Sequence, residues 1–277
     1  MQAIREATQL LAEAQQETWR ALVEELGAEG TQLVEWADLD AAVQARLSAR
    51  FMQEVFPVLT PLAVDPKLPF PHISSLSLSI AVRLRDPERG VELFARVKVP
   101  QIIGRLVHVG DGRVLLLEGL IREHLHVLFA GHEVVDAHLF RITRDADIEV
   151  EEGEADDLLA AIEEELRQRR FGKVVRLEIE ATAPDEVRTV LLDGLGLDAG
   201  ALVEVHGVMD LSLAMELSQL PAPHLRAPAW QPITPLRIAT AERAPDGAPD
   251  LFATIGEGDL LVHHPYERDR KSSRLNS

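Results

Sequence analysis

Two arginines three positions apart are the strongest candidates for ion recognition in the sequence. Arg141 and Arg144 belong to the run Arg-Ile-Thr-Arg-Asp-Ala-Asp that ends at Asp147, and this run is expected to be extended. Successive side chains of a strand point to opposite faces, so the two guanidinium groups can serve different partners. A guanidinium binds a phosphate or a carboxylate through two parallel hydrogen bonds. The run therefore indicates either an anion-facing site or a structural corner of ion pairs.

More basic residues follow an acidic stretch. Residues 147–165 are rich in Asp and Glu, and the next basic residues are Arg167, Arg169, Arg170, Lys173 and Arg176. The common interpretation of such a pattern is a salt-bridged solvent face, and the alternative is a strip that faces an anion. On the second interpretation, the candidate polyanion-facing residues are Arg141, Arg144, Arg169 and Arg170.

The histidine pairs offer little for metal binding or nucleophilic catalysis. His124 and His126 are two positions apart on an expected helix, so they face different sides, and we interpret both as surface or boundary residues. His263 and His264 are adjacent and would point to opposite faces of a strand, which favours a structural role. The sequence has no Gly-Lys-Ser/Thr phosphate loop, no Gly-x-Ser-x-Gly elbow and no His-Glu-x-x-His pair.

Charge and composition restrict the class of protein. The 277 residues carry a formal net charge of −18, so the overall field repels a polyanion, and a site for one needs a local concentration of cations. Nucleic-acid binding is not expected from this charge and from 4% aromatic residues. The absence of cysteine fits a reducing compartment, and no apolar run approaches the roughly 20 residues of a membrane span. We expect a cytoplasmic protein and leave peripheral membrane association open.

The elements expected to position these residues mix helices with strands. Helices are predicted at 2–26, 39–55, 118–128, 155–170, 185–195 and 211–219, with Asp38 or Asp40 as the N-cap of the second. A half-buried β-hairpin is predicted at 75–85 and 91–99, and further strands at 105–109, 114–117, 134–143, 173–181 and 202–207. The order predicts an α+β fold, in which N-terminal helices precede a mixed, partly antiparallel sheet with packed helices.

Two proline-rich segments interrupt these elements. The apolar run from Phe56 to Pro71 contains several X-Pro steps, which disfavour regular helix, so an extended and buried junction between two structural units is predicted. Residues 220–237 contain five further prolines and are predicted to form an irregular connector.

Several segments, in this order, resemble the long-chain polyphosphate kinases. They are Phe56 to Pro71, Leu76 to Leu84, Arg96 to Pro100, Leu128 to Gly131, Arg141 to Asp147, Arg169 to Glu178, Asp250 to Phe252 and Asp259 to Glu267. The resemblance covers residues 1–267. It implies that 1–29 is the last helix of an N-terminal helical domain, 30–254 the middle (head) domain, and 255–267 the start of the first C-terminal catalytic domain. Residues 268–277 depart from the family and are interpreted as a non-native tail of a chain truncated at both ends.

The resemblance also implies an activity. Family members transfer the terminal phosphate of ATP to polyphosphate reversibly, with Mg²⁺ and a phosphohistidine intermediate. The head domain of the family makes dimer contacts and helps to frame the polyphosphate path, so a homo-oligomer is expected. The family's catalytic residues match no position here; the fragment alone is therefore predicted to be inactive and to bind neither ATP nor Mg²⁺ tightly. The alternatives left open are a non-catalytic dimerisation or interaction module and a regulatory polyanion-binding domain.

Overall fold

The computed structural model describes residues 2–64, 70–145, 172–220, 222–228, 230–242 and 249–268. The chain divides into two compact units, Met1–Gln219 and Leu220–Ser277, and each is described by itself. The predicted α+β class is confirmed, while the predicted domain boundaries remain predictions. None of the described helices is both long and apolar enough to cross a membrane.

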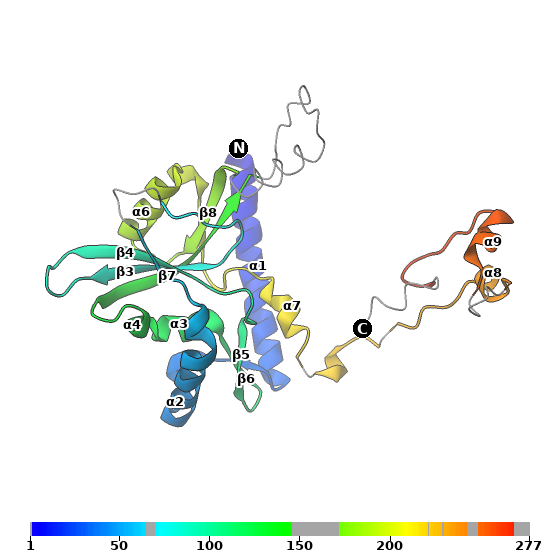
Figure 1. Cartoon of the computed structure of the whole chain (residues 1–277), viewed down its shortest axis with the longest axis horizontal. Coiled ribbons are helices and arrows are strands. Elements are labelled where there is room, and N and C mark those ends of the chain that lie inside the picture. Colours follow the sequence, from blue (N-terminus) through cyan, green and yellow to red (C-terminus); the bar gives the residue numbers. More distant parts are fainter. Residues whose placement is uncertain are drawn as a thin grey trace, which may run out of the picture. The chain divides into compact units, whose positions relative to one another are not determined.

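The first unit begins with the long helix α1 (Gln2–Ala28), which lies beside the sheets in Figure 1. Its end follows from Gly30, whose φ of +88° is easily adopted only by glycine. The side-chain amide of Gln16 fixes the helix by donating to Val208 O at 2.8 Å and accepting from Val208 N at 3.1 Å. Much of the predicted apolar stripe is uncovered, because Leu11 is 65% exposed.

Helix α2 (Ala41–Arg50) continues into a π-helical turn over Phe51–Val55, so the predicted 39–55 helix is present with a change in winding. Asp40 is its N-cap, since the carboxylate accepts from Val43 N at 2.9 Å. The extended backbone predicted from Phe56 onward is wrong at its start. Phe56–Val58 is a 3-10 turn, which tolerates Pro57 because the first turn of a helix needs no backbone donor there.

The predicted burial of that proline-rich run holds in part only. Leu59 is buried, whereas Val58 is 45% and Leu62 is 42% exposed. The segment then forms the short edge strand β2 (Leu62–Val64), which pairs with a longer neighbour. An edge strand has one neighbour and one open side, which explains its exposure.

The main sheet has six strands in the order β2-β4-β3-β7-β8-β9, and a second sheet has the order β1-β6-β5. The strands of the main sheet beyond β2 are β3 (Ser79–Arg85), β4 (Glu92–Lys98), β7 (Glu133–Arg144), β8 (Val174–Glu180) and β9 (Leu202–Val205). The smaller sheet contains β1 (Gln32–Leu33), β5 (Leu106–Gly110) and β6 (Arg113–Leu116). The predicted hairpin is confirmed, with Arg85 opposite Glu92, and every pair of the main sheet is antiparallel except β8 with β9.

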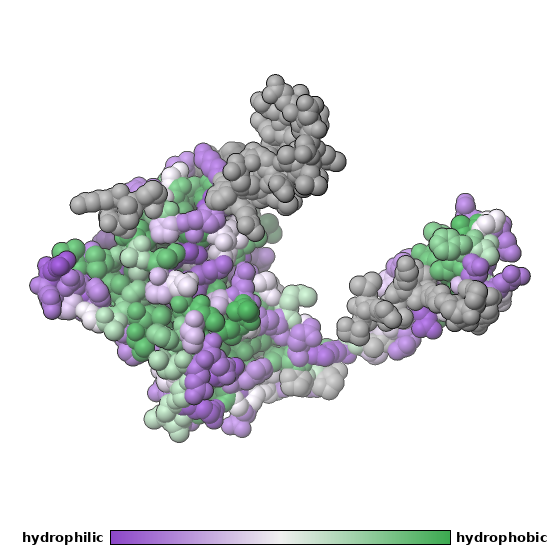
Figure 2. Space-filling model, viewed as in Figure 1, coloured by the Kyte–Doolittle hydropathy of each residue, from purple (hydrophilic) through white to green (hydrophobic). Residues whose placement is uncertain are grey.

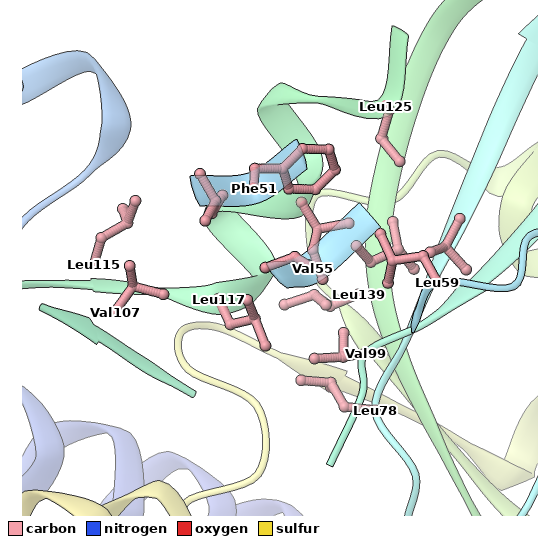
Figure 3. Packing of buried hydrophobic residues seen from close by; sticks show 14 of the residues in the cluster. Phe51, Val55, Leu59, Leu78, Val99, Val107, Leu115, Leu117, Leu125 and Leu139 are labelled. Carbon is pink, nitrogen blue, oxygen red and sulfur yellow. The ribbon is translucent and has the colours of Figure 1, made fainter. Parts of the chain in front are cut away.

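The prediction of a half-buried hairpin is wrong for β3, because both faces of this strand are covered. Ile80 and Ala81 point to opposite faces and both are 0% exposed. On the Ile80 face, α2 and its π-helical turn build the core that Figure 3 shows around Phe51 and Leu139. On the Ala81 face, a second cluster includes α6 (Asp185–Leu195). A central strand between two cores loses the alternation that one solvent face would impose.

The predicted helix 118–128 consists of α3 (Leu117–Glu123) and α4 (Leu125–Leu128), separated at His124. The surface placement of His124 is wrong: it is 5% exposed, and its Nε2 lies 2.8 Å from Ser48 Oγ. Its ring also stacks on Phe51 at 4.4 Å, which explains the burial. His126 is exposed, as predicted. The predicted helix 211–219 is the shorter α7 (Leu213–Leu217), and the predicted helix 155–170 lies outside the described residues.

The second unit contains the 3-10 turn Pro223–Leu225, α8 (Leu236–Ala239) and α9 (Leu251–Gly256). An isolated bridge joins Ile233 to Glu267. His263 and His264 lie at an exposed turn rather than on a strand, contrary to the expectation of opposite strand faces. Figure 2 shows hydrophobic surface on this unit, to which Phe252 and Leu261 contribute.

Candidate functional site

Arg141 lies on β7 and is held by carboxylates. Its Nε donates to Glu178 Oε2 at 2.6 Å, and its Nη1 lies 3.1 Å from Asp210 Oδ1. The other oxygen of Glu178 accepts from Arg176 at 2.8 Å. Burial acts to lower the pKa of Arg141, but the hydrogen bond and the charge of Glu178, together with Asp210, outweigh it and the pKa rises. The charge of Arg141 is therefore compensated inside the protein.

Arg144, on the same strand, contacts neutral acceptors. Its Nε donates to Ile73 O at 2.9 Å, its Nη1 to Gly172 O at 2.7 Å, and its Nη2 lies 3.3 Å from His72 Nδ1. Within the described parts of the chain, no carboxylate pairs with it. Burial lowers the pKa of Arg144, and no opposing charge offsets this.

Arg96, on β4, is the second arginine of this kind. It is 5% exposed, its Nε donates to Ser79 Oγ at 3.1 Å, and its Nη1 reaches His72 O at 3.4 Å. Burial lowers the pKa of Arg96. Burial also lowers the pKa of His72, and the charges of Arg144 and Arg96 lower it further. The two guanidinium groups thus converge on His72.

Lys98 extends the group along β4. It is two residues beyond Arg96 and therefore on the same face of the sheet, and the register places it opposite Ser79. Its ammonium makes no ion pair with any described residue. We call His72, Arg96, Lys98 and Arg144 the cationic cluster.

The sequence prediction that Arg141 and Arg144 serve different partners is confirmed by these contacts. Which of the candidates faces a polyanion stays a prediction, and Arg169 and Arg170 lie outside the described residues. Sequence reasoning missed Arg96 and His72. The available signal was the pair of basic residues, Arg96 and Lys98, two positions apart on one face of a predicted strand.

Two cavities formed by described residues of the first unit lie away from the cationic cluster. The two cavities, of about 260 and 400 Å³, adjoin α1 and share Gln16, Arg20 and His206, and neither contains a residue of the cationic cluster. Among the described residues, no three His, Asp or Glu side chains are grouped to hold a metal ion. The guanidinium and ammonium groups of the cationic cluster favour anions.

Comparison with known proteins gives a consistent result. The family model described as the polyphosphate kinase middle domain matches residues 42–217. The chain is 46% identical over 275 residues to a polyphosphate kinase of Mycobacterium ulcerans, covering 95% of this chain and 37% of that protein. It is 47% identical over 257 residues to one of Mycobacterium tuberculosis strain H37Rv, covering 87% and 34%.

A solved structure has the same fold. The crystal structure of a polyphosphate kinase from Porphyromonas gingivalis aligns with a TM-score of 0.73 at 24% identity, covering 99% of this chain and 39% of that one. The chain spans about a third of the length of the curated relatives it matches. With the middle-domain model matching well over half of its residues, the chain belongs to the polyphosphate kinase family.

Proposed function

We propose that this chain supplies the middle (head) domain of an enzyme that reversibly transfers the terminal phosphate of ATP to polyphosphate through a phosphohistidine. The match of residues 42–217 to the middle-domain model carries the proposal, and the 46% identity to a full-length relative supports it. ATP and Mg²⁺ are the cofactors of that reaction. Because the chain spans about a third of its relatives, we propose that it does not perform phosphoryl transfer by itself.

The role proposed for the head domain is to help guide the polyphosphate chain. Phosphoryl transfer depends on positioning the substrate and neutralising its charge more than on acid–base groups. A protein with a net charge of −18 needs cations gathered in one place to hold a polyanion. Of the candidates Arg141, Arg144, Arg169 and Arg170, Arg144 is favoured because its charge is not compensated by a carboxylate among the described residues.

A chimera tests the function. Residues 42–217 would replace the corresponding part of the Mycobacterium tuberculosis polyphosphate kinase, and acid-insoluble polymer made from labelled ATP and Mg²⁺ would be measured. We expect the folded chimera to synthesise polyphosphate and the 277-residue chain alone to form neither polymer nor phosphohistidine. Loss of synthesis in a folded chimera would contradict the head-domain assignment, and labelling of the chain alone would contradict its inactivity.

An interaction module is the second candidate, favoured by the uncovered apolar side of α1. Ile4, Leu10 and Leu11 are each about two-thirds exposed. Apolar side chains gathered on one helix side are typical of contact surfaces. Under this function, sedimentation of the purified chain shows a concentration-dependent dimer that Leu10→Glu and Leu11→Glu dissociate, and tripolyphosphate does not bind.

A further inference from the structure

The arginines of the main sheet divide into two classes. The described strands carry six, and four of them have a carboxylate within 4 Å: Arg83, Arg85, Arg141 and Arg176. Arg96 and Arg144 are the two that have none among the described residues. Within the main sheet these two arginines are therefore the exceptions, and both contact His72.

The hydrogen bonds of these two arginines leave donors unused. A guanidinium carries five N–H groups. Arg144 directs three nitrogens at Ile73 O, Gly172 O and His72 Nδ1, and Arg96 directs two at Ser79 Oγ and His72 O. Two N–H groups on Arg144 and three on Arg96 therefore have no acceptor among the described residues. The contacts that do form hold the planes of both guanidinium groups in place.

Burial strengthens the effect of this uncompensated charge. Arg96 is almost fully buried, whereas Arg144 and Lys98 are partly exposed, so the field of Arg96 is screened less than that of a surface arginine. Burial lowers the pKa of both arginines, yet arginine stays protonated at neutral pH. The charges of Arg96 and Arg144 thus meet at His72, and that of Lys98 lies on the same face of β4 as Arg96. Both guanidinium groups have N–H donors without an acceptor among the described residues.

We propose that the cationic cluster binds an oxyanion, a phosphate group of a linear polyphosphate, and that Arg141 takes no part in this site. The oxyanion chemistry follows from the unused guanidinium donors, since planar forks match the oxygens of a phosphate. The assignment to polyphosphate rather than to another phosphate compound rests on the proposed function. His72 orients both arginines, through its carbonyl and its ring.

Binding of tripolyphosphate to the 277-residue chain, measured by titration calorimetry at low salt, tests the site. Arg144→Gln should weaken binding about tenfold, and Lys98→Gln a few-fold, since each removes one charged contact to phosphate. The matched control is Arg50→Gln, which removes the same charge from an exposed pair with Glu54 and should leave binding within about twofold. Circular dichroism checks that each variant is folded.

Several results would overturn the proposal. One is no binding of tripolyphosphate at low salt; another is binding that folded Lys98→Gln and Arg144→Gln proteins retain unchanged. Lys98→Gln keeps the test decisive if Arg144→Gln does not fold, because the Lys98 ammonium makes no ion pair with the described residues and the strand pairing of Lys98 uses its backbone. Arg141→Lys, which keeps the charge, should not change affinity; a large loss would place Arg141 in the site.

Two comparisons identify the source of the phosphate. Tighter binding of tripolyphosphate than of inorganic phosphate supports a chain of phosphates, and tighter binding of ATP than of tripolyphosphate overturns the polyphosphate assignment. A chimera that fails to synthesise polymer, beside a chain that binds tripolyphosphate through the cluster, would refute the proposed function alone. A chimera that synthesises polymer, beside a chain whose binding of tripolyphosphate does not depend on the cluster, would refute this site alone.

Discussion

Arg141 and Arg144 are three residues apart on one strand and have opposite electrostatic surroundings. Arg141 stands directly opposite Glu178 in the pairing of β7 with β8, so a carboxylate is at hand. Arg144, at an odd spacing from Arg141, lies on the other face of the strand and contacts the segment around Ile73 instead. The comparison teaches that the sequence neighbours of an arginine say less about its role than the strand beside it does.

The largest effect is expected from removing the carboxylate that defines the surroundings of Arg141. Glu178→Leu removes the partner that Arg141 and Arg176 share; because Asp210 still lies beside Arg141, the loss should be near the lower end of the about 3–5 kcal/mol typical of a broken buried ion pair. Urea unfolding followed by circular dichroism measures the loss. Glu54→Gln, at an exposed pair, should cost less than about 0.5 kcal/mol. A Glu178→Leu protein as stable as the parent would show that Arg141, like Arg144, does not depend on a carboxylate partner.

The direct comparison exchanges each arginine for methionine. Arg141→Met removes one of the two arginines beside Glu178 and beside Asp210, and should destabilise the fold by about 2–3 kcal/mol. Arg144→Met removes hydrogen bonds to carbonyl groups and should cost about 1–2 kcal/mol. Tripolyphosphate affinity should show the reverse order, with the loss confined to Arg144→Met. Equal effects in both assays would remove the distinction between structural and ligand-facing arginine.

The pH dependence of stability sharpens the description of the Arg144 surroundings. The pKa of His72 is below the usual 6.5 in the folded chain, because of burial and then the charges of Arg144 and Arg96. The unfolded chain therefore binds more protons at this residue, so stability is lost as pH falls through 6.5 and is fully present above it.

Unfolding free energies measured at several values between about pH 5 and pH 8 test this sign, since the slope should become shallower in His72→Gln. Arg144→Met should flatten it partly, by removing one of the charges. Saturating tripolyphosphate should raise the pKa of His72, seen in its ring resonances, because a bound anion offsets the arginines. A slope that is the same in His72→Gln would show that His72 does not feel the cluster.

Much of this fold was accessible from local sequence patterns. The hairpin, the strand that carries Arg141 and Arg144, and the cap at Asp40 follow from alternation, turn residues and capping chemistry. Two of the misses share a cause, which is contact between distant segments. His124 is buried by Phe51, and Ala81 is covered by a second core that its own strand does not reveal.

The candidate site shows the same limit. The arginine pair on β7 was identified from its residue types and spacing. Alternation also predicted that the two serve different partners. Which of them has a carboxylate partner was not predictable, because this depends on Glu178 facing one arginine and on His72 bringing Arg96 to the other. No local pattern encodes the pairing of β7 with β8 across the residues between them.

The smallest expected effect concerns the contact that positions the backbone at the turn of the strand. Ser75 Oγ accepts from Arg144 N at 3.0 Å, just where the ladder shifts register. Ser75→Ala removes one exposed hydrogen bond and should cost about 0.5–1 kcal/mol. If this bond helps to aim Arg144, tripolyphosphate affinity falls a few-fold while that of Ser75→Thr, which keeps the hydroxyl, does not. Unchanged affinity in Ser75→Ala would show that the carbonyl contacts of the Arg144 guanidinium are sufficient to hold it in place.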